Sequence, residues 1–208
     1  MNAVMAGIDG FLETVRGYAE SVDSEVADRE NDFRSMCFWN IHNRALLTKE
    51  ILTFYMRSWE AGVPEGTEGE MTERVVTVTR DMFIDTVSSI EKASKDCVKA
   101  YPKSGLKEKA MDGMKYLYLR NIIGASAELG YINDSVMDEW DGILTMRNLV
   151  THNNSVADRS KVFEIGDIRI SMRPNRMMKG PADTFVVLTD KVTRLFYDWL
   201  ITVDVMFG

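Results

Sequence analysis

Arg147 and His152 stand five residues apart at the end of a helical pattern, and together their side chains could act on a phosphate ester. A guanidinium is permanently charged and can donate two parallel hydrogen bonds to phosphate oxygens. An imidazole exchanges protons near neutral pH, so it can act as a general acid or base. Asn148 follows Arg147 directly and shares a helix edge with His152, four residues on. We predict that these three residues form a catalytic group.

Helical spacing places Arg147 on an apolar stripe, seven residues after Trp140 and four after Ile143. Burying a guanidinium without a partner would cost several kcal/mol. The fold must therefore offer this side chain a carboxylate, a partner subunit or a phosphate. A purely structural pair is the alternative interpretation, in which Arg147 bridges to an acid of the N-terminal helices and His152 caps its own helix.

A basic run follows the motif directly and could hold the backbone of a nucleic acid. Residues 159–179 contain six bases against only Glu164 and Asp167. The six candidate RNA-binding residues are Arg159, Lys161, Arg169, Arg173, Arg176 and Lys179. The net charge of the whole chain is −7, which argues against a broad nucleic-acid surface, and a solvated face is the alternative interpretation of the run.

The spacing Arg147-x4-His152, with the polar Asn148, resembles the Arg-x4–6-His motif of the HEPN family (higher eukaryotes and prokaryotes nucleotide-binding domains). Members are small helical domains, and many are metal-independent endoribonucleases. The layout of residues 104–206 carries the resemblance as well. It implies RNA cleavage by attack of the 2′-hydroxyl, with Arg147 and His152 catalytic and Asn148 supportive. It implies no metal and no other cofactor.

The resemblance also implies partners. In HEPN nucleases two protomers pair so that two copies of the motif meet, so we expect a homodimer. Roles in defence or in a toxin–antitoxin pair follow from the same likeness, with an antitoxin or another protein as partner. Family members silenced by nucleotidylation carry Tyr two residues after the His, where this chain has Asn154, so the resemblance does not extend to that form of control.

The alternative to a ribonuclease is a non-catalytic HEPN-like module that binds a protein or a nucleotide.

The elements that must position these residues are mostly helical, because apolar residues recur at helical spacing over the first 150 residues. We predict an all-α helical bundle of about six helices with one inserted β-hairpin. Predicted helices cover residues 3–20, 24–60, 73–100, 104–129, 135 to the motif, and 189 onward. The alternating runs 162–165 and 168–171 flank Gly166-Asp167, which is typical of a type II′ hairpin. Predicted helix caps are Thr72, Gly130 and the run Asn133-Asp134-Ser135.

Length and composition favour one soluble domain. At 208 residues we predict a single domain over 1–208, with the HEPN-like core at 104–206 packed on helices within 3–100. The sequence has neither a membrane-length apolar run nor a basic signal-peptide start, so we expect a cytoplasmic protein without membrane contact. Cys37 and Cys97 fall within helical patterns and indicate reduced core thiols.

Two further candidates carry less chemistry. His42 lies mid-helix in Trp39-Asn40-Ile41-His42, and we interpret it as structural, although it could reach the same cleft. We predict no metal site, because no acids stand at ligand spacing from either histidine. Arg120-Asn121 repeats the Arg-Asn pair without a later histidine, and we interpret that repeat as coincidence.

Overall fold

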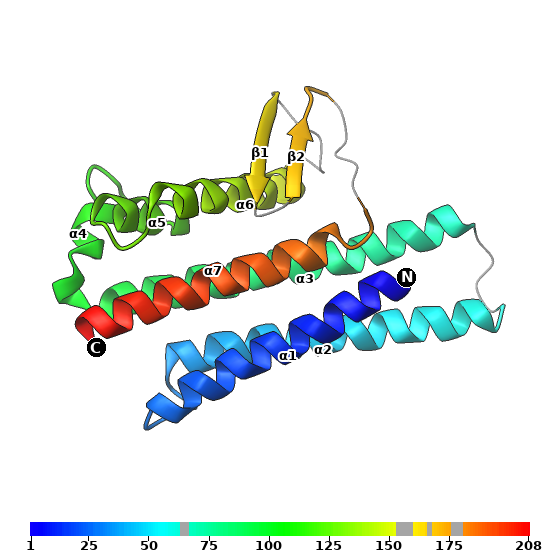
Figure 1. Ribbon diagram of the computed structural model, residues 1–208, viewed down its shortest axis with the longest axis horizontal. Coiled ribbons are helices and arrows are strands. Elements are labelled where there is room, and N and C mark those ends of the chain that lie inside the picture. Colours follow the sequence, from blue (N-terminus) through cyan, green and yellow to red (C-terminus); the bar gives the residue numbers. More distant parts are fainter. Residues whose placement is uncertain (63–66, 153–159, 166–167, 176–180) are drawn as a thin grey trace. The chain divides into compact units, whose positions relative to one another are not determined.

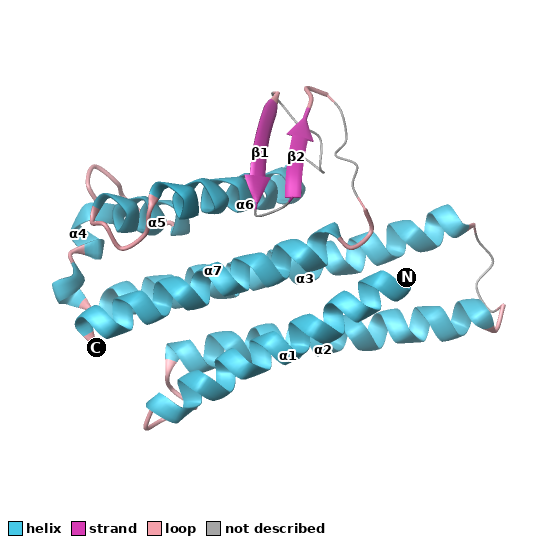
Figure 2. Ribbon diagram, viewed as in Figure 1, coloured by secondary structure: helices cyan, strands magenta, loops and turns pink. Residues whose placement is uncertain are grey.

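The protein is described by a computed structural model that covers residues 1–62, 67–152, 160–165, 168–175 and 181–208 (Figure 1). These residues form seven α-helices, one short 3-10 helix and one antiparallel hairpin (Figure 2), which confirms the predicted all-α fold with an inserted β-hairpin. The elements are α1 (Asn2–Glu25), α2 (Phe33–Glu60), α3 (Glu68–Ala100), η1 (Pro102–Ser104), α4 (Leu106–Ala110), α5 (Leu119–Glu128), α6 (Asp134–His152), β1 (Lys161–Ile165), β2 (Ile168–Met172) and α7 (Thr184–Phe207).

The chain divides into two compact units. The first comprises Met1–Thr86 with Gly180–Asp190, and the second comprises Val87–Lys179 with Lys191–Gly208. Both α3 and α7 therefore contribute residues to each unit. The predicted single domain over 1–208, with its HEPN-like core at 104–206, stays a prediction.

In the first unit, α1 packs along α2 through apolar residues at helical spacing. The first turn of α7 joins them, since a Cβ added to Gly7 would lie 3.2 Å from the Val186 side chain. Phe83 of α3 meets Phe185 of α7, with ring centroids 5.8 Å apart. The fully buried positions of this core include Ile8, Val15, Phe38, Leu52 and Met82.

In the second unit, α5 and α6 form an antiparallel pair through a short connection. Trp199 of α7 is buried and donates its indole N–H to Ser126 Oγ of α5 at 2.9 Å. The hairpin packs on α6 through β1. Its register pairs Glu164 with Arg169 across the strands. The predicted strands are confirmed, and the predicted type II′ turn at 166–167 lies outside the described residues.

The helix ends follow capping chemistry, though not always at the predicted residue. Thr67 caps α3: its N–H donates to Glu70 Oε2 at 2.6 Å, and the Glu70 N–H donates to Thr67 Oγ1 at 3.3 Å. The predicted cap at Thr72 is therefore wrong. Gly130 follows α5 with φ of 78°, as predicted. Asn133 caps α6, because its Oδ1 accepts the Val136 N–H at 3.0 Å.

The predicted continuous helix over 104–129 is wrong. The chain forms η1, α4 and α5 instead, and residues 111–118 between α4 and α5 are not helical. Gly113 takes a φ of +68°, a left-handed conformation that ends a helix. The Met114 N–H donates to Met111 O at 2.9 Å and closes the turn. Tyr118 is extended and precedes the first residue of α5.

Three other helix boundaries move. α1 continues to Glu25, and α2 begins only at Phe33, with Asp32 accepting the Arg34 and Ser35 N–H groups. α7 begins at Thr184, five residues before the predicted start. A helix can continue through such polar residues where tertiary packing holds its apolar face, which local signals do not record.

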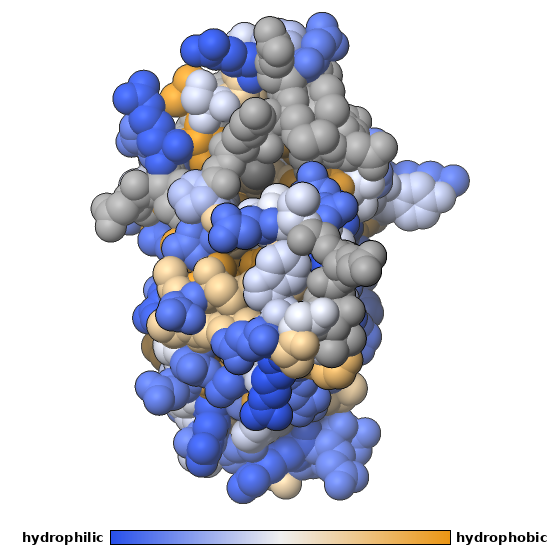
Figure 3. Space-filling view, turned by 90° about the vertical axis from the view of Figure 1, so that its right-hand side faces the viewer, coloured by the Kyte–Doolittle hydropathy of each residue, from blue (hydrophilic) through white to orange (hydrophobic). Residues whose placement is uncertain are grey.

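The face of the molecule that Figure 3 draws is mainly polar. On the face drawn in Figure 3, hydrophilic side chains cover most of the described residues, and hydrophobic ones show in smaller patches between them. Of the helices in the described ranges, none has both the length and the hydropathy to cross a membrane. Cys37 and Cys97 are both buried, as predicted.

Candidate functional site

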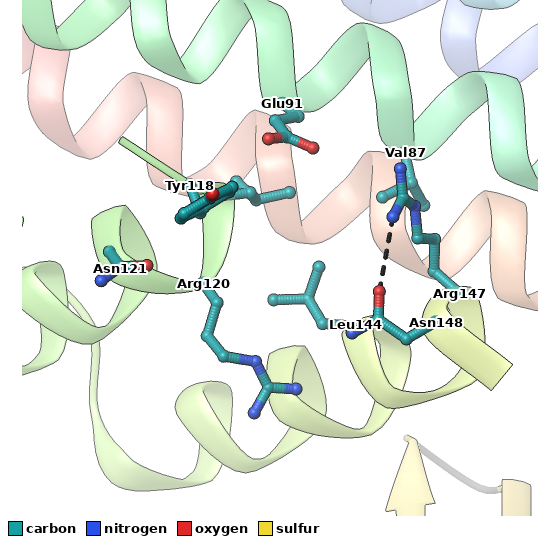
Figure 4. A pocket seen from close by; sticks show the side chains of 9 residues that line it. Val87, Glu91, Tyr118, Arg120, Asn121, Leu144, Arg147 and Asn148 are labelled. Carbon is teal, nitrogen blue, oxygen red and sulfur yellow. Dashed lines mark hydrogen bonds between the residues drawn. The ribbon is translucent and has the colours of Figure 1, made fainter. Parts of the chain in front are cut away.

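A pocket of about 240 Å³ in the second unit contains two of the three predicted catalytic residues (Figure 4). Arg147 and Asn148 reach it from α6, Glu91 from α3, and Tyr118 from the residue before α5. Leu144 forms an apolar part of the lining, one helical turn before Arg147 and Asn148. Arg147 and Asn148 of the predicted catalytic group thus line one pocket, and His152 is not among its described lining residues.

Arg147 holds its guanidinium at this pocket with few partners. Trp140 and Ile143 are fully buried on the same stripe, and Arg147 itself is half-buried. Its Nη1 donates to Asn148 Oδ1 at 3.4 Å, a long hydrogen bond. Its Nε is buried, and in the described part of the chain it meets neither a hydrogen-bond acceptor nor a carboxylate. No described carboxylate of the second unit pairs with Arg147, and the bridge to an acid of the N-terminal helices stays an alternative.

The other charged side chains of the pocket are already neutralised. Glu91 accepts from Lys95 Nζ at 2.7 Å, an i,i+4 pair within α3. Arg120 pairs with Asp141 of α6 and points away from Glu91 and Tyr118 in Figure 4. Arg147 is consequently the unbalanced charge among the described lining residues. The pocket suits an anion.

The second Arg-Asn pair lies at the same pocket. Arg120 and Asn121 belong to the first turn of α5 and line it together with Arg147 and Asn148. The turn at Gly130 makes α5 and α6 antiparallel, which brings the start of α5 beside the middle of α6. Nothing in the spacing of the two pairs along the sequence indicates this meeting, and their interpretation as coincidence overlooked the helix pairing.

His152 does not join Arg147 in the pocket. It is the last residue of α6, exposed, and absent from the described lining. Five residues of α-helix separate the two by about 7.5 Å along the axis and about 140° around it. A single protomer thus presents the guanidinium and the imidazole at different places on α6. Residues 153–159, which follow, lie outside the described ranges.

The basic run is only partly described. Arg169 on β2 and Arg173 just after it are both exposed. Lys161 is the first residue of β1. Arg159, Arg176 and Lys179 lie outside the described residues. Because β1 packs on α6, the hairpin that carries Lys161 and Arg169 lies against the helix of Arg147 and His152.

His42 has a different setting. It is half-buried on α2 in the first unit, and its ring meets Trp39 edge-on with centroids 5.4 Å apart. Burial lowers the pKa of His42, Arg16 lowers it further, and Asn43 opposes the shift. Its Nδ1 has no hydrogen-bond partner among the described residues. This setting fits the structural interpretation of His42.

The chain matches no protein-family model, no curated protein and no solved structure. Fold and site therefore define the class on their own: an all-α protein with an inserted hairpin and a pocket suited to an anion. The resemblance to the HEPN family rests on Arg147, Asn148 and His152 and on the layout of residues 104–206.

Proposed function

We propose that this chain is a HEPN-type endoribonuclease that cleaves RNA without a metal ion, as a homodimer. One observation carries the proposal: a half-buried Arg147 guanidinium lines a pocket and has no carboxylate partner among the described residues. Such a cation lowers stability unless something neutralises it. A phosphate fits best, because its oxygens match the planar fork of a guanidinium.

The proposed reaction breaks the bond between phosphorus and the 5′-oxygen. The 2′-oxygen attacks phosphorus as a base removes its proton, and an acid returns a proton to the departing 5′-oxygen. A 2′,3′-cyclic phosphate remains on one fragment. Arg147 stabilises the negative charge that grows on the phosphate oxygens, and Asn148 holds the guanidinium through the side-chain hydrogen bond.

The two proton transfers need two groups on opposite sides of the phosphorus. Each chain carries a single motif histidine, so His152 of each protomer would supply one transfer. Its exposure at the end of α6, away from the pocket of its own chain, suits a site shared between protomers. The exposed cations Arg169 and Arg173, with the other four basic residues of the run, would hold the RNA backbone. The buried thiols fit a reducing compartment such as the cytoplasm.

The second candidate is a non-catalytic module that binds a phosphate-bearing ligand or an acidic protein. The absence of His152 from the described lining of the pocket favours it. The two candidates share the anion at Arg147 and differ in the fate of the RNA. Cleavage, rather than binding, therefore separates them.

The test is incubation of the full chain with single-stranded RNA in excess EDTA, followed by analysis of the fragment ends. We expect 2′,3′-cyclic phosphate or 3′-phosphate ends. Light scattering on the same sample should give the mass of a dimer. RNA that is bound but stays intact would support the binding module instead. Full activity in a monomeric sample would overturn the shared site.

A further inference from the structure

Two tyrosines next to the pocket are unusually exposed. Tyr116 is 57% and Tyr118 is 51% exposed, and both belong to the non-helical segment 111–118 between α4 and α5. Their ring centroids lie 6.3 Å apart, and the ring planes meet at 68°. Large aromatic rings usually lose most of their surface to the core. Here the break in the helix leaves two of them in solvent.

The tyrosines have a cationic setting. Lys115 Nζ lies over the Tyr116 ring, 5.2 Å from its centroid. Tyr118 lines the pocket that contains Arg147, and in Figure 4 these two lie on opposite sides of it with Leu144 between them. Exposed aromatic rings beside cations are the usual surface for unpaired nucleic-acid bases.

We propose that Tyr116 and Tyr118 stack on unpaired bases of single-stranded RNA whose phosphate is bound by Arg147. The inference rests on the proposed function for the phosphate at Arg147 and adds the class of substrate. An aromatic face can stack only on a base that has left its own stack, so a duplex offers nothing to these rings. Every base has such a face, so this pair of tyrosine rings, called the platform below, distinguishes single strands from duplexes and does not distinguish one sequence from another.

The backbone around Tyr118 holds the platform in place. Its carbonyl accepts the Asn121 and Ile122 N–H groups at 3.0 and 3.1 Å, which fixes the residue at the start of α5. The next residue, Leu119, is 2% exposed and anchors the turn in the core. The Tyr118 ring can therefore meet a ligand without first ordering its own segment, which lowers the entropic cost of binding.

The test measures binding, not cleavage, in the full chain carrying His152→Ala, so that the RNA stays intact. The probes are a short single-stranded RNA, the same strand annealed to its complement, and a nucleoside monophosphate. Tyr116→Ala and Tyr118→Ala should each weaken binding of the single strand by roughly 5- to 150-fold. Tyr116→Phe and Tyr118→Phe keep the ring and should bind within about twofold of the parent.

Phe54→Ala is the matched control, because Phe54 is an aromatic residue, 67% exposed, on α2 in the first unit. It should leave binding unchanged. Two outcomes would overturn the inference. One is that both alanine variants bind the single strand as tightly as the parent does. The other is that the parent binds the duplex or the mononucleotide as tightly as the single strand. Its failure is distinct from that of the proposed function. Loss of binding in the alanine variants with no cleavage by the wild type would keep the platform and remove the enzyme.

Discussion

Arg147 Nη1 and Asn148 Oδ1 lie 3.4 Å apart at the wall of the pocket, and this long contact is the only hydrogen bond of the guanidinium among the described residues. A guanidinium has five N–H donors. Most of them are thus free for a ligand, and one of its nitrogens is buried without an acceptor. The arrangement has a stability cost in the absence of a ligand and gives a means of binding an anion.

The first prediction separates function from stability at this residue. Arg147→Met removes a poorly satisfied charge and keeps an apolar stem, so the free energy of unfolding should stay equal or rise by up to about 2 kcal/mol. RNA binding and cleavage should nevertheless fall at least roughly tenfold, since one charge-assisted contact is lost. Thermal melts and RNA titrations measure both.

Arg120→Met is the control for that experiment. Arg120 lines the same pocket but already pairs with Asp141, so its loss should cost up to about 1 kcal/mol of stability. A large drop in the melting temperature of Arg147→Met would contradict the prediction. It would show that this guanidinium is a structural element.

The core contact between α5 and α7 gives a second prediction. Ser126→Ala leaves the buried Trp199 indole N–H without its acceptor, so the free energy of unfolding should fall by about 1–3 kcal/mol. Ser24→Ala, which removes an exposed hydroxyl, should change it by less than about 0.5 kcal/mol. Denaturant titrations measure the two variants. Equal loss in both would mean that the indole hydrogen bond contributes nothing.

The lowered pKa of His42 predicts that the free energy of unfolding depends on pH. Burial lowers its pKa in the folded chain below the ordinary value of 6.5. Below that pH the unfolded chain binds protons that the folded chain does not, so the free energy of unfolding should fall as the pH drops. Above it both states are neutral and His42 adds no pH dependence. The effect should be small, because the side chain is only half-buried.

The measurement compares melting temperatures of the wild type and His42→Gln from about pH 8 to about pH 5. The curves should run parallel above about pH 6.5 and converge or cross below it. Parallel curves over the whole range would show that the pKa of His42 is not lowered in solution.

The hairpin gives a prediction about salt. Arg169→Ser with Arg173→Ser should weaken binding to every RNA sequence and flatten the dependence of affinity on salt, because fewer counterions are released. Arg57→Ser with Arg74→Ser removes the same charge from exposed positions of the first unit and serves as the control. Titrations between about 50 and 200 mM salt measure the slope. The same slope for both double variants would make the basic run an ordinary solvated face.

Much of the helical framework could be predicted from apolar spacing. On α3, the apolar spacing places Val75, Met82, Phe83 and Ile90 on one helix face, which predicts that they face inward, and all four are buried. The same spacing predicted the buried face of α7. These helices are long and keep one phase of the 3.6-residue period, so the pattern alone determines which side is buried.

On α2 the buried face predicted from apolar spacing is partly wrong. Leu47 and Phe54 continue the apolar spacing along α2, which predicts that they face inward, but they are 44% and 67% exposed. The buried stripe instead passes through Ala45 and Thr48, a small residue and a polar one. Hydrophobicity alone ranks Leu47 above Thr48, while packing against a neighbouring helix follows the angular position of each residue. The sequence of one helix does not determine that choice.

Only part of the candidate site could be predicted from the sequence. Arg147 and Asn148 could be predicted, because a charged residue on an apolar stripe is a local signal. Tyr118 and Arg120 could not, since their positions depend on the break at Gly113 and on the pairing of α5 with α6. Leu, Ala and Met recur at helical spacing across residues 104–129, so the sequence predicts one continuous helix there.

The cleavage rate of His152→Ala tests the central claim most directly. His152 is proposed to transfer a proton, so its loss should slow cleavage by roughly 10²–10⁴-fold in a protein with an unchanged melting temperature. His42→Gln, which changes the other histidine of the chain, should cleave at the wild-type rate. Both rates are measured in EDTA with enzyme in excess over RNA. A folded His152→Ala protein that cleaves as fast as the wild type would contradict the account.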